Sequence, residues 1–373
     1  MVDALKRLAA LAIASSLLSV AAAQSSTAPT APTAPAAASL EDKLTPYLSP
    51  QLAVPVAKDR VINLVCLGHG SPTVILTSGL GHWSWWWWNV QLPLSEQTRV
   101  CSWDRAGWGF SSPSSEPQDT LHTTSDLERA LKEARITGPY VMVGHSLGAL
   151  ESLRFTDRHR RSVVGMVLVD PDIPDRATAE KRLAPRLAGV WQAVEPSMKL
   201  REECAAGLRS GTVKKDTPEF DRCTAAVGVP TALFPRQQAT MTRLNADPAR
   251  LLTQASLGKE HYASSREVTD AKRNYGDMPL IVLTAGRADA ALLTTLSTLP
   301  AGMTSTPEDM VQLREEIARF IRDGWGAGHD AYAALSTRGR SQLVPDSGHN
   351  IMVEKPDVVI AAIAEVLSEA RHE

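Results

Sequence analysis

The run PYVMVGHSLGAL at residues 139–150 constrains the fold of this chain more than any other segment. Its centre, GHSLG at residues 144–148, is a G-x-S-x-G motif that follows β-favouring residues and precedes helix formers. A strand, a sharp turn and a helix in that order expose the serine hydroxyl above a sheet, beside the N–H groups that begin the helix. The motif therefore predicts Ser146 as a nucleophile and the backbone N–H of Leu147 as a donor to a developing oxyanion.

Two more segments supply the groups that such a serine needs. Residues 73–81, TVILTSGLG, indicate a buried strand ending in a glycine turn, which predicts the N–H of Leu80 as the second oxyanion donor. Of the nine histidines, His349 alone is expected in a loop between a late strand, 341–344, and a final helix, 356–370. A histidine in such a loop is positioned to act as the general base.

Five motifs occur along the chain in the order SGLG, CSWDRAGWGFS, GHSLG, LVLVDPD and DSGHNI. Together they resemble the α/β-hydrolase superfamily. They are most similar to its bacterial exported branch of esterase-like serine hydrolases, which has one cysteine in the first strands and another just before the D-R-x-G-x-G-x-S loop. The resemblance covers residues 60–172 and 277–370. It implies an α/β-hydrolase fold, with a mainly parallel twisted sheet, helices on both faces and a mostly helical cap insert.

The resemblance leaves two positions for the acid of a Ser-His-Asp triad. Asp170 follows an expected strand at 163–169, and the exported branch regularly has an aspartate in this L-V-D motif. Asp289 follows an expected strand at 279–283, where many other relatives have the acid. Both positions preserve the order serine, aspartate, histidine along the chain. We favour Asp170 and keep Asp289 as the alternative acid.

The N-terminal residues are typical of an exported chain. Lys6 and Arg7 precede a short apolar stretch, and three alanines at 21–23 offer a cleavage site. Residues 1–23 are therefore expected to be a signal peptide, because the apolar stretch is too short to cross a membrane comfortably. This predicts a secreted or periplasmic protein with no stable membrane insertion after signal cleavage.

Composition divides the remainder of the chain. Residues 24–40 are a Thr-, Ala- and Pro-rich linker that lacks the apolar residues of a core. The hydrolase core is expected at 41–172 and 277–373. Residues 173–276 match no motif and are expected to form the helical cap insert.

Two helix starts can be predicted in detail. Ser125 and Glu128 have the spacing of a capping box, which predicts a helix through Ala134. Thr306 and Pro307 suit the N-cap and first helical position of an amphipathic helix that packs on the core domain. Its apolar residues are Met310, Leu313, Ile317, Phe320 and Ile321.

The four cysteines form an even set, as in many exported proteins. They allow three pairings, and proximity along the chain and in the expected strands favours Cys66 with Cys101 and Cys204 with Cys223. Four free thiols, as in a cytosolic relative, are the alternative.

Charge and motif content argue against several classes of partner. The net charge is −2 and no run of Lys and Arg occurs, so neither nucleic acid nor an anionic membrane surface is an expected partner. The sequence has no metal-ligand spacing, phosphate loop or dinucleotide fingerprint, which predicts neither a metal nor another cofactor. A small-molecule ester is the expected partner.

A tryptophan cluster, WSWWWW at residues 83–88, follows the predicted oxyanion turn at once. In a helix Trp85 and Trp88 share a face and the two between them point elsewhere, so all four cannot line one pocket. Most are expected to pack against the core or under the cap. Trp83 and Trp85 are the candidates for a wall of the acyl pocket.

These observations predict a serine hydrolase that cleaves a carboxylic ester through an acyl-enzyme. Cleavage of an amide or peptide bond, as in iminopeptidases, or of a carbon–carbon bond by the same triad is the alternative within enzymes. Epoxide hydrolase and haloalkane dehalogenase chemistry is disfavoured, because those enzymes have an aspartate in place of Ser146. A binding protein on a catalytically dead hydrolase scaffold is the alternative from another class. The acyl and alcohol groups and the oligomeric state stay open.

Overall fold

The computed structural model describes residues 40–186, 188, 195–225, 235–267, 270, 272–287 and 307–371. The chain divides into two units, 1–39 and 40–373, and only the second contains described residues. The predicted signal peptide, nearly all of the linker, Asp289 and Thr306 lie outside the described residues.

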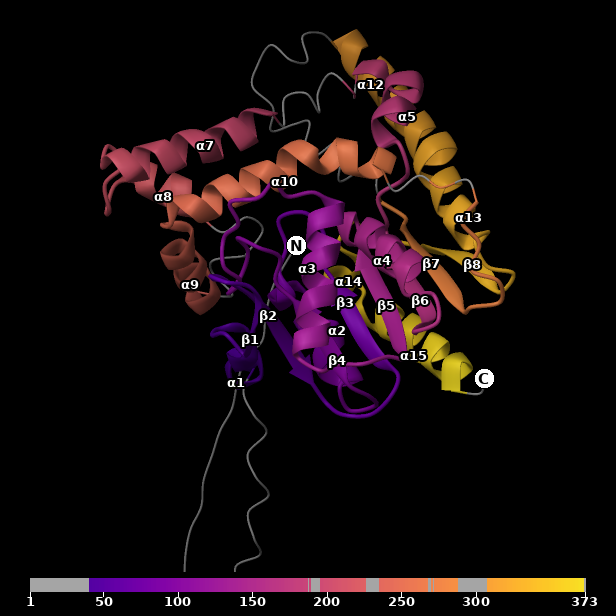
Figure 1. The fold of residues 1–373 in the computed structure, drawn as a ribbon. Coiled ribbons are helices and arrows are strands. Elements are labelled where there is room, and N and C mark those ends of the chain that lie inside the picture. Colours follow the sequence, from indigo (N-terminus) through magenta and orange to yellow (C-terminus); the bar gives the residue numbers. More distant parts are fainter. Residues whose placement is uncertain are drawn as a thin grey trace, which may run out of the picture. The chain divides into compact units, whose positions relative to one another are not determined.

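An eight-stranded sheet forms the centre of the described unit (Figure 1). Its strands lie in the order β1-β2-β4-β3-β5-β6-β7-β8. The pairs β1–β2 and β2–β4 are antiparallel, and every later pair is parallel, from β4–β3 to β7–β8. The bounds are β1 Leu52–Ala57, β2 Arg60–Leu67, β3 Thr73–Thr77, β4 Val100–Trp103, β5 Tyr140–His145, β6 Val163–Val169, β7 Leu280–Ala285 and β8 Gly339–Val344. The expected mainly parallel sheet is confirmed.

Helices cover both faces of the sheet, because its central strands are apolar on both sides. On β5, Val141 and Val143 join one buried cluster while Met142 joins the other. Helices α2 (Trp88–Leu94), α14 (Ile351–Glu354) and α15 (Pro356–Arg371) contribute to the first cluster. Helices α3 (Thr120–Glu133), α4 (Leu147–Arg158) and α13 (Ala327–Ala333) contribute to the second. A short α1 (Leu40–Leu44) and a 3₁₀ turn, η1 (Thr45–Tyr47), precede the sheet.

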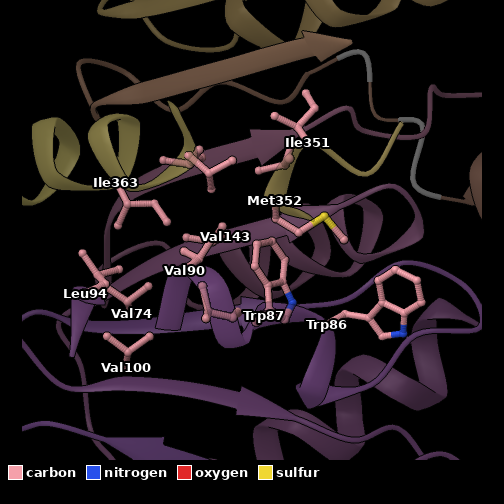
Figure 2. Close-up of a cluster of buried hydrophobic side chains, with 14 of the residues drawn as sticks. Val74, Trp86, Trp87, Val90, Leu94, Val100, Val143, Ile351, Met352 and Ile363 are labelled. Atoms are coloured by element: carbon pink, nitrogen blue, oxygen red, sulfur yellow. The ribbon is translucent and has the colours of Figure 1, made fainter. Parts of the chain in front are cut away.

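Four of the clustered tryptophans are buried in the first of these layers. Trp83, Trp85, Trp86 and Trp87 all belong to that cluster, and Trp88 packs against it. They lie on or beside a 3₁₀ turn, η2 (Ser84–Trp87), that leads into α2. Figure 2 shows Trp87 among the aliphatic side chains beside Met352, with Trp86 at one side of the cluster. The expectation that most of these rings pack against the core is confirmed.

The described parts of the 173–276 segment are helical. They comprise α5 (Arg176–Leu183), α7 (Glu195–Ser210), α8 (Pro218–Thr224), α9 (Pro235–Asn245) and α10 (Pro248–Glu267). Helix α10 packs along α7 and contacts α3 and α4 of the core (Figure 1). Its Arg250 and Gln254 donate hydrogen bonds to backbone carbonyls in the loop after β4. This loop carries the glycines of the DRAGWGFS motif, so α10 connects the 173–276 segment to it.

Helix α12 (Pro307–Phe320) begins at Pro307, as the sequence predicts. Its partner differs from the expectation. Leu313, Ile317 and Phe320 pack with Ile173 and Ala184, so α12 packs on the region of α5 and not on the core sheet. The apolar stripe predicts that a face is buried but not which neighbour buries it.

The predicted helix start at Ser125 is wrong. Helix α3 begins at Thr120, and the side chain of Asp119 caps it by accepting a hydrogen bond from the N–H of His122. Ser125 lies inside the helix, where its hydroxyl donates to the carbonyl of Leu121. An aspartate caps as well as a serine, and the S-x-x-E spacing also occurs within helices.

Both predicted disulfides are confirmed, Cys66–Cys101 and Cys204–Cys223. The first joins paired residues of the antiparallel strands β2 and β4. The second joins α7 to α8 inside the 173–276 segment. Among the described residues, no helix combines the length and the apolar character needed to cross a membrane.

Candidate active site

Ser146 occupies the turn between β5 and α4 with φ 52° and ψ −123°. A positive φ is unfavourable for a serine and marks the sharp turn that a nucleophile elbow requires. The turn is tight because α4 approaches β3 closely: a side chain at Gly148 would collide with the carbonyl of Thr77. Ser146 is 8% exposed, and its hydroxyl makes no capping hydrogen bond to the N–H groups of α4. Hydrogen bonds of a nucleophile often form only when substrate binds.

Asp170 lies at the carboxyl end of β6 and contacts His349 directly. The Nδ1 of His349 lies 2.6 Å from Oδ2 of Asp170. This is the hydrogen bond expected of a triad acid, and it leaves Nε2 of His349 available to a serine. The carboxylate is 1% exposed, whereas the histidine side chain is 39% exposed. The alternative acid, Asp289, lies outside the described residues.

Two further donors hold the other oxygen of Asp170. The N–H of Ala285 lies 2.9 Å and the indole Nε1 of Trp325 lies 3.1 Å from Oδ1. Burial alone would raise the pKa of Asp170, but the hydrogen bond and the charge of His349 lower it below its ordinary value, with smaller contributions from His329 and Ala285. The carboxyl is therefore ionised at neutral pH, which suits a partner of an imidazolium.

Trp325, which donates to Asp170, is a site residue that no sequence motif indicates. It belongs to η4, a π-helical turn at Ile321–Gly326 between α12 and α13. The wider turn of a π-helix is frequent at functional sites. No local pattern in the sequence marks this turn. Trp325 and Asp170 are 155 positions apart in the chain, so their contact cannot be predicted from neighbouring residues.

His145 connects the serine turn to the histidine loop. Its Nε2 lies 2.9 Å from the carbonyl oxygen of His349, and the two rings lie 4.6 Å apart. A carbonyl only accepts, so Nε2 of His145 carries the proton. Burial, then the charge of His349, lowers the pKa of His145 well below its ordinary value. A neutral His145 thus holds the backbone of His349 next to Ser146.

The predicted oxyanion turn is held by a buried ion pair. Nε of Arg105 lies 2.7 Å from Oε1 of Glu151, and the two side chains are 2% and 0% exposed. The same guanidinium donates to the carbonyls of Ser78 and Gly79, the latter at 3.0 Å. In a trans peptide the N–H points away from the carbonyl, so this contact directs the N–H of Leu80 away from Arg105.

The second predicted donor, the N–H of Leu147, is in the first turn of α4, where backbone N–H groups have no intrahelical acceptor. Gly79 lets the predicted oxyanion turn lie close to the serine turn. A Cβ on Gly79 would lie 3.2 Å from Cβ of Ser146 and 2.7 Å from Nδ1 of His145. Only glycine permits this approach.

A cavity of about 340 Å³ adjoins the oxyanion turn. Leu80, Gly81 and Trp108 line it from the core, and residues of α7, α8 and α10 line it from the 173–276 segment. Trp83 and Trp85 are not among the lining residues, and both are 3% exposed. Trp108, in the glycine-rich loop after β4, is the aromatic residue among those that line this cavity.

The described residues include no group of three or more His, Cys, Asp or Glu side chains that could hold a metal ion. The polar groups brought together at the site are the serine turn, the Asp170–His349 pair and the oxyanion turn. Their arrangement suits attack by a serine on a carbonyl group.

A model of the alpha/beta hydrolase family matches residues 64–362. This is most of the chain, so the protein belongs to the α/β-hydrolase family. An AB hydrolase superfamily protein of Gibberella zeae is 33% identical over 103 residues, which make up 26% of this chain and 32% of that protein. The first curated relatives that the chain matches are covered over at most 44% of their own length.

Solved structures share the fold at low identity. An esterase of Thermogutta terrifontis is 18% identical with a TM-score of 0.50, and the match covers 86% of this chain and 99% of that one. The epoxide hydrolase CorEH is 16% identical with a TM-score of 0.53, and the match covers 85% and 98%. Such identities establish a common fold only. The reaction and the substrate have to be inferred from the residues of this site.

Proposed function

We propose that this hydrolase cleaves a carboxylic ester with Ser146 as nucleophile, His349 as general base and Asp170 as the acid that orients it. The observation that carries the proposal is the 2.6 Å contact between Nδ1 of His349 and Oδ2 of Asp170, beside the positive-φ turn of Ser146. Because Nδ1 donates to the carboxylate, Nε2 is the nitrogen that accepts a proton.

In the first step the hydroxyl oxygen of Ser146 bonds to the ester carbonyl carbon and its proton passes to Nε2 of His349. The N–H groups of Leu80 and Leu147 stabilise the oxyanion of the tetrahedral intermediate. Collapse of the intermediate expels the alcohol, which takes the proton from His349, and leaves an acyl-serine. Water then attacks the acyl-serine with His349 again as base, which releases the acid and restores Ser146.

We further propose that the 173–276 segment acts as a cap that covers the substrate, and that the protein works outside the cytosol. The first proposal is supported by the cavity that α7, α8 and α10 share with the oxyanion turn. Two disulfides support the second, because disulfides persist in oxidising compartments. The N-terminal residues expected to form a signal peptide agree with export.

A fluorophosphonate probe tests the nucleophile directly. We expect it to label the wild-type protein and not Ser146→Ala, while Ser125→Ala, which removes a hydroxyl from the solvent side of α3, stays labelled. A panel of p-nitrophenyl esters against proline and alanine anilides then separates ester from amide cleavage. Labelling of Ser146→Ala, or esterase turnover by that variant at the wild-type rate, would end the serine-hydrolase proposal.

A further inference from the structure

We propose, on the basis of the proposed ester hydrolysis, that the substrate carries a carboxylate on an apolar body and that Arg201 binds this carboxylate in the cavity beside the oxyanion turn. Arg201, on α7, lines the cavity together with Leu80 and Gly81. Leu80 follows Gly79, whose Cβ position lies 3.2 Å from Cβ of Ser146. A ligand in the cavity is thus next to the residues that would hold the reacting carbonyl.

Arg201 is partly buried and held in place by neutral groups. Its Nη1 donates to Oε1 of Gln254, and its guanidinium lies 5.6 Å from the ring of Trp108. The amide of Gln254 is itself fixed, because its Nε2 donates to the carbonyl of Gly107 at 2.8 Å and to Asn245 at 3.2 Å. An amide and an aromatic ring orient the guanidinium without neutralising its charge.

Three other arginines with low solvent exposure have their charge or their donors satisfied by the protein. Arg105 pairs with Glu151, and Arg176 lies 2.6 Å from Glu180. Arg250 donates to two backbone carbonyls. Among the described residues no carboxylate pairs with Arg201, and burial lowers its pKa with no acid acting against this effect. A guanidinium that lines a cavity and has no carboxylate partner is available to an anion that binds there.

The other residues that line the cavity indicate the chemical character of the rest of the substrate. Met198, Leu200 and Trp108 make much of the lining apolar, and no acidic residue belongs to it. Arg222 is a second cation of the lining, but Glu219 lies 3.4 Å from it and its side chain is 60% exposed. A guanidinium fork matches a carboxylate in geometry and charge. The cavity therefore suits a half-ester or a carboxylate-bearing ester with an aliphatic or aromatic body.

Two pairs of test substrates separate charge from shape, because an isopropyl group has the shape of a carboxylate. The acyl-side pair is 4-nitrophenyl hydrogen adipate and 4-nitrophenyl 6-methylheptanoate. The alcohol-side pair is 4-acetoxybenzoate and 4-isopropylphenyl acetate. Arg201→Met keeps an unbranched apolar side chain and removes the guanidinium with its charge. Arg209→Met, at an exposed position of the same helix, is the matched control, and Arg201→Lys retains charge without the fork.

We expect Arg201→Met to lower kcat/KM for the charged member of at least one pair by roughly 10- to 100-fold, the usual range for a hydrogen bond to an ionised group. For the neutral member of each pair, kcat/KM of Arg201→Met should change by less than about threefold, because that substrate has no carboxylate to lose a partner. The Arg209→Met protein should also stay within about threefold of the wild-type kcat/KM for both members, because Arg201 is intact. Arg201→Lys should keep part of the preference. A wild-type protein without preference for either charged substrate, or an equal loss for charged and neutral members, overturns the proposal.

A binding measurement keeps this proposal separate from the proposed chemistry. Adipate is titrated into Ser146→Ala and into Ser146→Ala/Arg201→Met by calorimetry. Binding that weakens by roughly tenfold or more in the second protein supports the carboxylate site even if no ester is hydrolysed. Equal binding by both proteins, or none by either, overturns it, whereas failure of fluorophosphonate labelling alone would overturn only the serine chemistry.

Discussion

Two arginines near the turn at residues 78–81 differ in whether a carboxylate neutralises their charge. Arg105, from the core, is paired with Glu151 and also donates hydrogen bonds to the carbonyls of Ser78 and Gly79. Arg201, from the 173–276 segment, lines the cavity by the same turn and has an amide as its hydrogen-bond partner. A buried cation that the protein neutralises positions the backbone, whereas a partly buried cation without a carboxylate partner is available to a ligand.

The same difference separates the two regions as a whole. In the core, Asp170 receives hydrogen bonds from His349, Ala285 and Trp325, so the geometry of the acid is determined from several sides. In the 173–276 segment, the cavity wall includes the Cys204–Cys223 disulfide and Gln254, whose amide oxygen accepts a hydrogen bond from Arg201. We infer that the core is built for chemistry and the 173–276 segment for selection of substrate.

The largest expected effect concerns the acid of the core. Asp170→Asn should lower kcat by roughly 10³- to 10⁴-fold, because an amide favours the wrong tautomer of His349. Asp289→Asn should behave like the wild-type protein, since a carboxylate outside the triad makes no interaction that strengthens in the transition state. Steady-state kinetics with p-nitrophenyl butyrate measure both. The reverse pattern would assign the acid to Asp289.

Arg105 tests whether its ion pair positions the oxyanion turn. Arg105→Met should destabilise the fold by roughly 3 to 5 kcal/mol, because the carboxylate of Glu151 stays buried without a countercharge and keeps only its hydrogen bond from Thr123. In Arg105→Met/Glu151→Gln, which removes both charges, we expect most of this stability to return while kcat stays roughly 10²-fold low.

A trifluoromethyl ketone analogue of the transition state distinguishes positioning from stability. Its affinity for the double variant should fall in parallel with kcat, with KM nearly unchanged, if the N–H of Leu80 has lost its direction. A double variant with wild-type kcat and wild-type affinity for the analogue would show that the ion pair serves the fold alone.

The two disulfides separate the regions by stability and selectivity. Cys204→Ala/Cys223→Ala and Cys66→Ala/Cys101→Ala should each lower the free energy of unfolding by roughly 3 kcal/mol, since each bond restricts the unfolded chain. Only the first pair lines the cavity, through Cys204 and Cys223, and should reduce the preference for the charged test substrates. Chemical denaturation and the ratio of kcat/KM values measure the two effects. Equal loss of preference in both variants would contradict the division of roles.

The smallest expected effect concerns Trp325, a positioning residue for the acid. Trp325→Phe removes its 3.1 Å hydrogen bond to Oδ1 of Asp170 and should lower kcat by roughly tenfold with KM nearly unchanged. Trp87→Phe is the matched control, because Trp87 is fully buried and among the described residues its indole nitrogen has no hydrogen-bond partner.

The pH dependence of kcat tests the role of Trp325 as a hydrogen-bond donor, because a change in packing alone in Trp325→Phe would not shift it. The indole N–H of Trp325 bonds to the carboxylate of Asp170 and favours its ionised form, so we expect its loss to raise the pKa of Asp170 and activity to be lost at a higher pH on the acid side than in the wild-type protein. An unchanged acidic limb together with an unchanged kcat would remove Trp325 from the positioning machinery.

Much of the core could be predicted from the sequence because its signals are local. The strand, turn and helix around Ser146 all lie within residues 140–158, and the glycines that the turn requires can be recognised there. The parallel strands and both disulfide pairings were predicted in the same way, from apolar runs and from proximity, whereas the edge strand β1 was not predicted. The start of α3 was missed because Asp119 and Ser125 are both acceptable caps on local evidence.

The sequence by itself determined the fold family, the serine turn and the candidate base, since each depends on residues close together in the chain. It left two candidate acids, and it singled out Trp83 and Trp85 instead of Trp108 for a pocket wall. Only the tertiary structure placed Asp170 against His349 across 179 residues, Trp325 against Asp170, and Arg201 in a cavity without a carboxylate. Such contacts join separate strands, inserts and helices, and their energies depend on burial and on neighbours that no local pattern specifies.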